Sequence, residues 1–121
     1  MMRFRYRVLA STVALFVLAA TAFQAASAAS ADAQFRAAVA RVLNNIRSGQ
    51  QALADMSNAE FHAFVSCAQN VMDSAPRPDK EFVLAGRSLS EQRRRFDQVA
   101  SKVPLDRGAP LKGRITQSCY N

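Results

Sequence analysis

The residues of this chain that could carry out chemistry are few, and the first are its two cysteines, Cys67 and Cys119. In an oxidising compartment, an even number of cysteines is interpreted first as a disulfide framework, and two cysteines allow only one pairing. Closing a loop of about 50 residues stabilises a small domain by about 4 kcal/mol. A redox or metal-binding pair would need a C-x-x-C spacing or further ligands, and His62 is the only histidine. We therefore predict a structural disulfide between Cys67 and Cys119.

The densest positive charge in residues 29–121 is the run Arg93-Arg94-Arg95, which follows Arg87. In a helix, Arg87 and Arg94 are seven residues apart and would share one face, whereas Arg93 would fall on the apolar seam. Arg87 and Arg94 are therefore a candidate contact for an anionic partner, such as an acidic protein, a lipid headgroup or lipopolysaccharide. A solvated helix face, with the aliphatic stem of Arg93 lying over the core, is the favoured interpretation. Nucleic acid is not expected as a partner, because no aromatic residues alternate with the basic ones.

No pattern of catalytic residues is present in residues 29–121. His62 has no accompanying nucleophile motif and the acidic residues are scattered, so neither a histidine base nor a glycosidase-type pair of carboxylates has support. The chain has no glycine-rich phosphate loop and no C-x-x-C-H haem attachment motif. A cofactor held without covalent attachment would have only Met56, Met72 and His62 as ligands. We therefore expect no enzyme activity, and we assign no catalytic, cofactor-binding or metal-binding residue.

The N-terminal region has the three parts of a secretory signal peptide. Residues 1–7 carry three positive charges and no acid, residues 8–23 are uncharged and mostly apolar, and Ala26-Ser27-Ala28 fits an A-x-A cleavage site. We predict a signal peptide over residues 1–28, with cleavage after Ala31 as the alternative. An uncleaved membrane anchor competes with this interpretation, but a spanning helix needs about 20 apolar residues and this apolar segment is shorter. We expect export to the periplasm or beyond the cell, and the excess of arginine over lysine indicates a bacterial source.

Removal of the signal peptide would leave residues 29–121, which suffice for a single helical domain. A domain of this size buries only a modest fraction of its surface, so its core alone gives marginal stability. The disulfide would supply part of the remainder, and a homodimer is compatible with the long apolar stripes described below. The net charge of the whole chain is +7, and the +4 that remains without the signal peptide mainly supports solubility.

Apolar residues at alternating four- and three-residue steps predict a first helix that begins at Asp32, the expected N-cap. Ser48 and Gly49 interrupt this pattern, and a bend or break is expected there because glycine weakens a helix interior. The apolar stripe consists of Phe35, Val39, Val42, Leu43, Ile46, Leu53 and Met56.

A second helix is predicted to follow the capping box Ser57-Asn58-Ala59-Glu60, in which serine and glutamate satisfy each other's free N–H groups. It should end near Ser74, because Pro76 and Pro78 disfavour its continuation. Cys67 lies at the edge of its apolar face. That face consists of Phe61, Phe64, Val65, Ala68, Val71 and Met72.

A third helical region is predicted over residues 79–103, with Asp79 as its N-cap and Pro104 after its end. One long helix and two shorter ones both fit; we favour a break slightly, because Gly86 and a second capping box at Ser88 interrupt the pattern. A turn-rich loop over residues 105–110 and a short final helix from Pro110 complete the chain. The predicted apolar positions are Phe82, Leu89, Phe96, Ala100 and Val103, and in the final helix Leu111, Ile115 and Cys119.

No segment shows the two-residue alternation of a β-strand. The sequence therefore predicts an all-α fold, a small four- or five-helix bundle braced by one disulfide. We expect its function to be non-enzymatic binding to a protein partner, as an inhibitor, an immunity-type protein or a chaperone. The first alternative is peripheral contact with the envelope or an anionic lipid through the Arg-rich face. The second is a carrier that holds a small molecule or cofactor in the bundle core.

Overall fold

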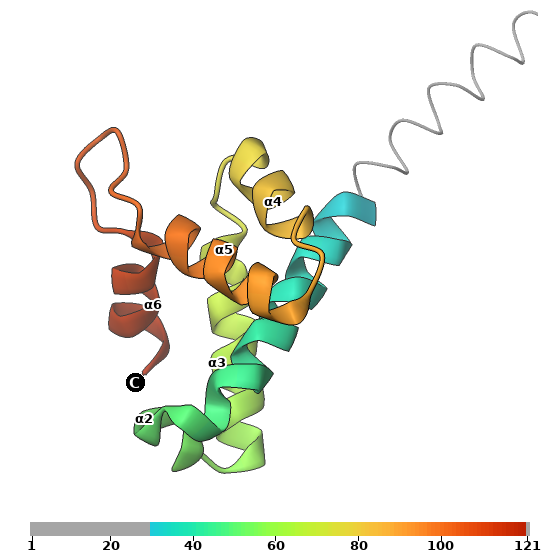
Figure 1. The fold of residues 1–121 in the computed structure, drawn as a ribbon. Coiled ribbons are helices and arrows are strands. Elements are labelled where there is room, and N and C mark those ends of the chain that lie inside the picture. Colours follow the sequence, from blue (N-terminus) through green and yellow to red (C-terminus); the bar gives the residue numbers. More distant parts are fainter. Residues whose placement is uncertain (1–29, 121) are drawn as a thin grey trace, which may run out of the picture. The chain divides into compact units, whose positions relative to one another are not determined.

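The computed structural model describes residues 30–120, which are all-helical, without a β-strand (Figure 1). The predicted signal peptide, residues 1–28, lies outside the described residues. Residues 30–46 are helical, and the chain from Gln34 onward forms one compact unit. The elements that follow are η1 (Arg47–Gly49), α2 (Gln51–Ala54), α3 (Asn58–Met72), α4 (Arg77–Leu84), α5 (Leu89–Ser101) and α6 (Leu111–Cys119). These described residues thus contain six α-helices, one more than the upper expectation, because α2 is separate.

The first helix differs from its prediction at its start and agrees with it at its end. Asp32 was expected to cap the helix, but residues 30 and 31 are already helical, so Asp32 lies within the helix and cannot be its N-cap. The break expected near Gly49 is confirmed: the α-helix ends at Ile46 and passes into η1, after which Gln50 is extended with φ −121° and ψ 116°. This change of direction returns Leu53 to the core, where it is 1% exposed.

The capping box predicted at the start of α3 is confirmed. The Glu60 backbone N–H donates to Ser57 Oγ at 3.1 Å, and the Ser57 backbone N–H donates to Glu60 Oε1 at 3.2 Å. Both bonds satisfy N–H groups that have no partner within the helix. The face of α3 expected to be apolar is buried at Phe61, Phe64, Val65, Ala68 and Met72.

Ser57→Ala is expected to lower the free energy of unfolding by about 1 kcal/mol, because it leaves the first turn of α3 without its side-chain cap. The denaturant midpoint at constant m-value measures this loss. Ser66→Ala, on the exposed side of the same helix, is the matched control and should have an effect within about 0.5 kcal/mol of zero. Equal losses in the two variants would contradict a capping role for Ser57.

The same capping box makes stability depend on pH through Glu60. Hydrogen bonds from the side chain and then the backbone of Ser57 hold the pKa of Glu60 below its ordinary value of 4.5. A carboxyl whose pKa is lowered by folding stabilises the fold above its unfolded pKa, and this contribution is lost as the pH falls through the folded pKa. The difference in unfolding free energy between the wild type and Glu60→Gln should therefore be present at pH 7 and shrink below about pH 4.5.

Residues 79–103 form parts of two helices, as favoured, but the first of these starts earlier than predicted. Asp79 is not the N-cap of α4: Pro76 caps it, and Asp79 lies in its first turn. The gap between α4 and α5 is enforced at Gly86, where an added Cβ would lie 2.9 Å from Gln92 Cγ and 3.0 Å from Gln92 N. Only glycine lets the start of α5 approach so closely. Ser88 then caps α5 by accepting a hydrogen bond from the Glu91 backbone N–H.

The apolar stripe predicted across this region is wrong at Phe82, Leu89 and Val103, which are exposed. Phe96 and Ala100 are buried as expected, and Val83 and Val99 provide the other buried side chains of α4 and α5. The reason is that the break at Gly86 gives each helix its own rotation, so one periodic pattern cannot run through both.

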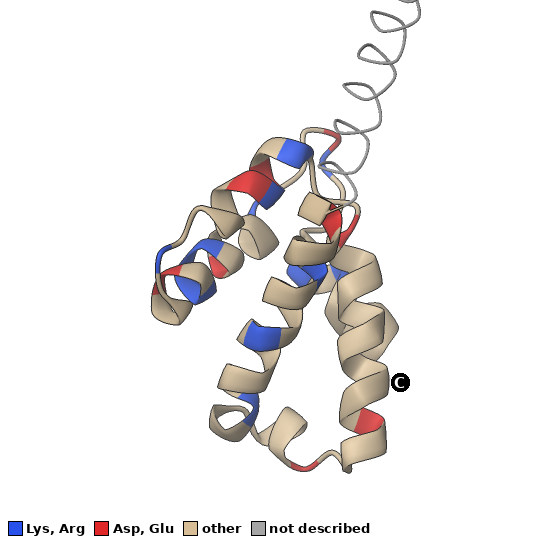
Figure 2. Ribbon diagram, turned by 90° about the vertical axis from the view of Figure 1, so that its right-hand side faces the viewer, with Lys and Arg blue, Asp and Glu red and all other residues tan. Residues whose placement is uncertain are grey.

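A single hydrophobic core joins the helices of this unit, and its largest fully buried side chains are Phe35, Val39, Val42, Leu53, Met72 and Val83. α3 packs against α6, α4 against α5, and α5 against α6. The segment 34–46 lies beside α3: Gln69 donates to the Arg36 carbonyl at 2.9 Å, and Arg36 pairs with Asp73. Figure 2 shows that charged residues gather on α4 and α5, whereas α3 has no Lys, Arg or Asp and Glu60 as its one Glu. None of the helices in residues 30–120 is long and apolar enough to cross a membrane.

Candidate functional site

A cleft of about 580 Å³ opens between the end of the first helix, α2, α3, α5 and α6. Its volume falls within the range of about 300–1,000 Å³ that is typical of small-molecule sites. Helices far apart in the sequence supply its walls, so it exists only because the core packs them together. We call this space the cleft, and it divides into an apolar floor and a charged mouth.

The floor of the cleft is made of buried hydrocarbon side chains. Val42 comes from the first helix, Leu53 from α2 and Phe64 from α3, and all three belong to the core. Among residues 30–120, no polar or charged residue is buried, so the floor offers a ligand no buried hydrogen-bonding side chain. The other buried side chains of the floor are Leu43 of the first helix, Phe96 and Ala100 of α5 and Ile115 of α6.

The mouth of the cleft carries three basic side chains and one acid. Arg93 and Arg94 extend from α5 and Lys112 from α6, and all three are exposed. Asp97 is the acid, and its Oδ1 lies 4.0 Å from Lys112 Nζ, with both side chains 69% exposed. An ion pair at this distance and exposure contributes little, so Lys112 stays available to an anion. The mouth therefore has a net charge of +2 above an apolar floor.

One cation of the mouth is also positioned by the first helix. Arg93 Nη1 lies 3.5 Å from Asn45 Oδ1, and next to it Arg41 Nη2 lies 3.5 Å from Gln92 Oε1. The first contact joins Arg93 to the first helix without neutralising its charge, and the second joins the same two helices through Arg41 and Gln92. The sequence-based expectation that Arg93 lies on the apolar seam is met only in part, because the side chain lines the cleft but is exposed.

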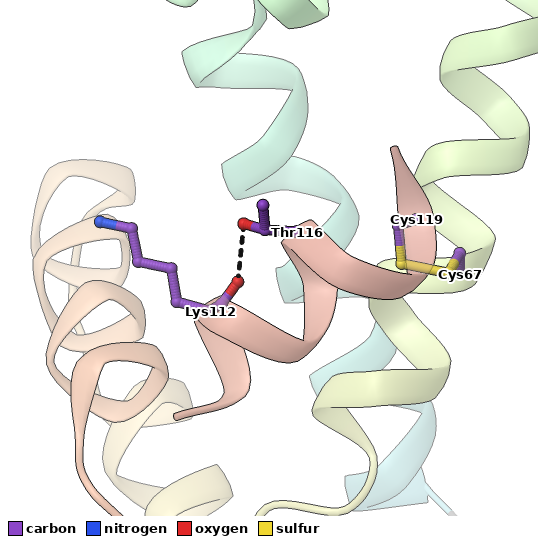
Figure 3. The surroundings of a disulfide bond; sticks show 4 residues. All are labelled: Cys67, Lys112, Thr116 and Cys119. Atoms are coloured by element: carbon purple, nitrogen blue, oxygen red, sulfur yellow. Dashed lines mark hydrogen bonds between the residues drawn. A yellow bond between two sulfur atoms is a disulfide. The ribbon is translucent and has the colours of Figure 1, made fainter. Parts of the chain in front are cut away.

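Cys67 and Cys119 lie at disulfide distance, with Cα atoms 5.6 Å apart, and link the middle of α3 to the end of α6 (Figure 3). The residue after Cys119 is Tyr120, whose ring lies 5.0 Å from that of Phe64 and lines the cleft. Lys112 extends from the other end of α6, away from the sulfur atoms (Figure 3). The link thus holds the helix that supplies one wall of the cleft.

The two arginines predicted to share a helix face do not do so. Arg87 precedes the N-cap Ser88 and is therefore outside α5; its backbone N–H donates to Glu91 Oε2 at 3.2 Å. Arg94 is on α5, and the cleft brings it together with Arg93 and Lys112 instead. The seven-residue spacing was misleading because a helical repeat has meaning only within one helix.

Arg95, the third arginine of the run, is occupied by structural contacts. Its guanidinium pairs with Glu91 Oε1 at 2.8 Å, donates to the Phe82 carbonyl at 2.8 Å and covers the Phe82 ring at 4.6 Å. The Arg87 backbone N–H and then Arg95 hold the pKa of Glu91 below its ordinary value. Arg95 therefore fastens α5 to α4 and takes no part in the cleft.

Sequence reasoning missed the contribution of α6 to the cleft. Lys112, Thr116 and Tyr120 follow one another at four-residue steps and all line it. Residues four apart lie on one face of a helix, so this polar series was a usable signal. It was missed because the apolar series of Leu111 and Ile115 runs beside it and is the stronger indication of packing.

The residues considered as cofactor ligands do not meet in the structure. His62 is exposed on α3, Met72 is fully buried, and none of Met56, Met72 and His62 lines the cleft. Within residues 30–120, no three His, Cys, Asp or Glu side chains come together as they would around a metal ion. The chain matches no family model, no curated protein and no solved structure.

Proposed function

We propose that this protein acts by non-enzymatic binding, and that the cleft holds a ligand with an apolar body and a negatively charged group. The observation that carries the proposal is the combination of a floor without buried polar side chains and a mouth with a net charge of +2. Among the functions considered from the sequence, this proposal corresponds to the carrier of a small molecule. It adds the contact with an anion for which Arg94 was a candidate.

The apolar floor supports binding through the hydrophobic effect. Burying apolar ligand surface contributes about 25 cal/mol per Å², whereas burying an amide or hydroxyl without a partner costs about 1–3 kcal/mol. Leu53, Phe64 and Ile115 have no polar atoms in their side chains and are largely dehydrated already. A ligand whose inner part is hydrocarbon therefore gains from entering, and a polar one does not.

The charged mouth supports the choice of an anion. Guanidinium groups such as those of Arg93 and Arg94 bind carboxylate and phosphate oxygens through paired N–H donors, and Lys112 adds a third positive charge. These cations are exposed, so the ligand's charged group can remain partly hydrated while its apolar part is buried. Export to the periplasm or beyond the cell remains part of this proposal, since the disulfide suits an oxidising compartment.

The test uses 1-anilinonaphthalene-8-sulfonate, a fluorescent probe that has an apolar ring system and one negative charge. Thr116→Trp places a large side chain in the cleft from an exposed position, and it should weaken probe binding by about tenfold or more. Ser118→Trp, exposed on the same helix and outside the cleft, is the matched control and should bind like the wild type. Melting temperatures verify that both variants fold. Unchanged binding by a folded Thr116→Trp would overturn the cleft as the site.

Binding to a protein partner, the function favoured from the sequence, is supported by one observation. Leu105 is fully exposed and Val103 is 66% exposed, next to a turn closed by a 3.0 Å hydrogen bond from the Arg107 N–H to the Pro104 carbonyl. A fixed turn that presents two aliphatic side chains to solvent could fill a pocket of another protein. Immobilised wild-type protein should then retain one protein in stoichiometric amount, and the Val103→Ser, Leu105→Ser double variant should not. Equal retention by both would refute a contact at this turn.

A further inference from the structure

We infer that the ligand of the cleft is a single-chain anionic lipid, with its hydrocarbon chain on the floor and its headgroup between Arg93, Arg94 and Lys112. The inference rests on the proposed function and deepens it by naming the ligand class. Its grounds are the composition of the floor, the size of the cleft and the charge balance of the mouth.

The composition of the floor favours a flexible hydrocarbon chain. The floor combines the aliphatic side chains of Val42, Ala100 and Ile115 with the rings of Phe64 and Phe96, so it is hydrocarbon throughout and a flexible chain can follow it. No buried polar side chain of the described residues faces the ligand. The floor also favours a hydrocarbon chain over an extended peptide, because peptide amide groups that reached it would have no buried side-chain partners.

The size of the cleft argues against an amphipathic helix as the occupant. One helical turn is about 10 Å across and 5.4 Å long, and therefore occupies on the order of 400 Å³. The cleft of about 580 Å³ would accept little more than one such turn, which is too short to be stable alone. A single acyl chain, by contrast, can bend to follow the floor from Ile115 toward Leu53.

The charge balance of the mouth defines how the headgroup is held. Arg93, Arg94 and Lys112 line the same cleft, and Asp97 beside Lys112 is the one acid among the described residues that line it. Asp97 lowers the attraction for an anion, so its neutralisation should strengthen binding. We therefore expect one substitution in the mouth, Asp97→Asn, to increase the affinity for the anionic ligand.

The experiment measures the affinity of the full chain, in its disulfide-linked form, for saturated fatty acids of increasing length and for the fatty alcohols of equal length. All ligands are used below their critical micelle concentrations. Each added methylene should strengthen binding about fourfold until the chain exceeds the cleft. Fatty acids should bind about tenfold more tightly than alcohols at low salt, and this advantage should shrink in 1 M salt.

Variants of the mouth separate the headgroup contact from the chain contact. Arg94→Ala with Lys112→Ala should abolish the advantage of acid over alcohol while alcohol binding stays unchanged. Asp97→Asn should increase fatty-acid affinity about threefold and leave alcohol affinity unchanged. Arg107→Ala removes a cation that does not line the cleft and is the control for net charge, with no effect expected on either ligand.

Two further ligands identify the source of the headgroup and the number of chains. A monoalkyl phosphate that binds more tightly than the fatty acid of equal length, and loses this advantage in the same mouth variants, supports the inference. It assigns a lysophospholipid as the ligand rather than a fatty acid. Equal affinity for acid and alcohol, no gain with chain length, or preference for a two-chain phospholipid would overturn it. These failures are distinct from failure of the proposed function, because the Thr116→Trp result with the sulfonate probe reports on the cleft independently.

Discussion

Replacing Cys67 and Cys119 together by alanine is expected to lower the free energy of unfolding by about 4 kcal/mol. The disulfide closes a loop with a sequence separation of 52 residues, and chain entropy predicts a cost of this size for opening a loop of about that length in the unfolded state. For a domain of this length, about 4 kcal/mol corresponds to a fall of roughly 15–30 °C in melting temperature. Thermal unfolding followed by circular dichroism measures the change.

The control for this prediction is the wild-type protein after reduction. It should melt at the temperature of the double variant, and a reducing agent should not lower the melting temperature of the variant further. Free-thiol labelling of the unreduced wild type should find neither cysteine reactive. Two labelled thiols, or a wild type whose melting is insensitive to reduction, would contradict a stabilising disulfide.

Loss of the disulfide should also weaken ligand binding in the cleft. Cys119 ends α6, and Tyr120 directly after it contacts Phe64 at the edge of the cleft. When the end of α6 is released, this ring contact loses its covalent support. We expect the double variant to bind the sulfonate probe more weakly even at temperatures where it remains folded.

Phe35→Ala is expected to cost about 3–5 kcal/mol of unfolding free energy, the second of the two largest effects. Phe35 is 0% exposed and packs in the core, so its truncation removes a large buried surface and leaves a cavity. Urea unfolding at pH 7 measures the loss. A total stability of about 5–15 kcal/mol means that this variant could be largely unfolded at 37 °C.

Phe82→Ala is the matched control, because the same chemical change is made at a second phenylalanine from a predicted apolar stripe. Phe82 is 39% exposed and touches the Arg95 guanidinium, so its truncation should cost only about 1 kcal/mol. Similar costs for the two variants would show that the burial of Phe35 and the exposure of Phe82 are assigned wrongly.

Features encoded by neighbouring residues could be predicted from the sequence alone. The capping box at Ser57 and Glu60, the end of α3 ahead of Pro76 and the cap at Ser88 each depend on hydrogen bonds or ring geometry within about four residues. The pairing of Cys67 with Cys119 was predictable for a different reason, because two cysteines leave one combination. Asp79 shows the limit of such reasoning. It is a suitable N-cap residue, but the N-cap of α4 is Pro76, three residues earlier, so Asp79 lies inside the first turn.

The cleft could not be predicted in this way. Arg94 and Lys112 are on different helices, and their meeting at one opening depends on how α5 crosses α6. That crossing is set by the packing of side chains such as Phe96 and Ile115 in the shared core. A sequence pattern carries no direct record of it, since any helix with the same apolar face could pack at several angles.

Local spacing therefore accounts for the helices, their caps and the covalent link, while packing between distant helices accounts for which charges gather and where. Arg87 and Arg94 illustrate the difference: their spacing suggested one helix face, but α5 begins only after its N-cap Ser88, so Arg87 lies outside the helix that carries Arg94. The physical reason is the range of the interactions. Hydrogen bonds of a helix join residues four apart, whereas a binding site is formed by side chains that only the folded core brings together.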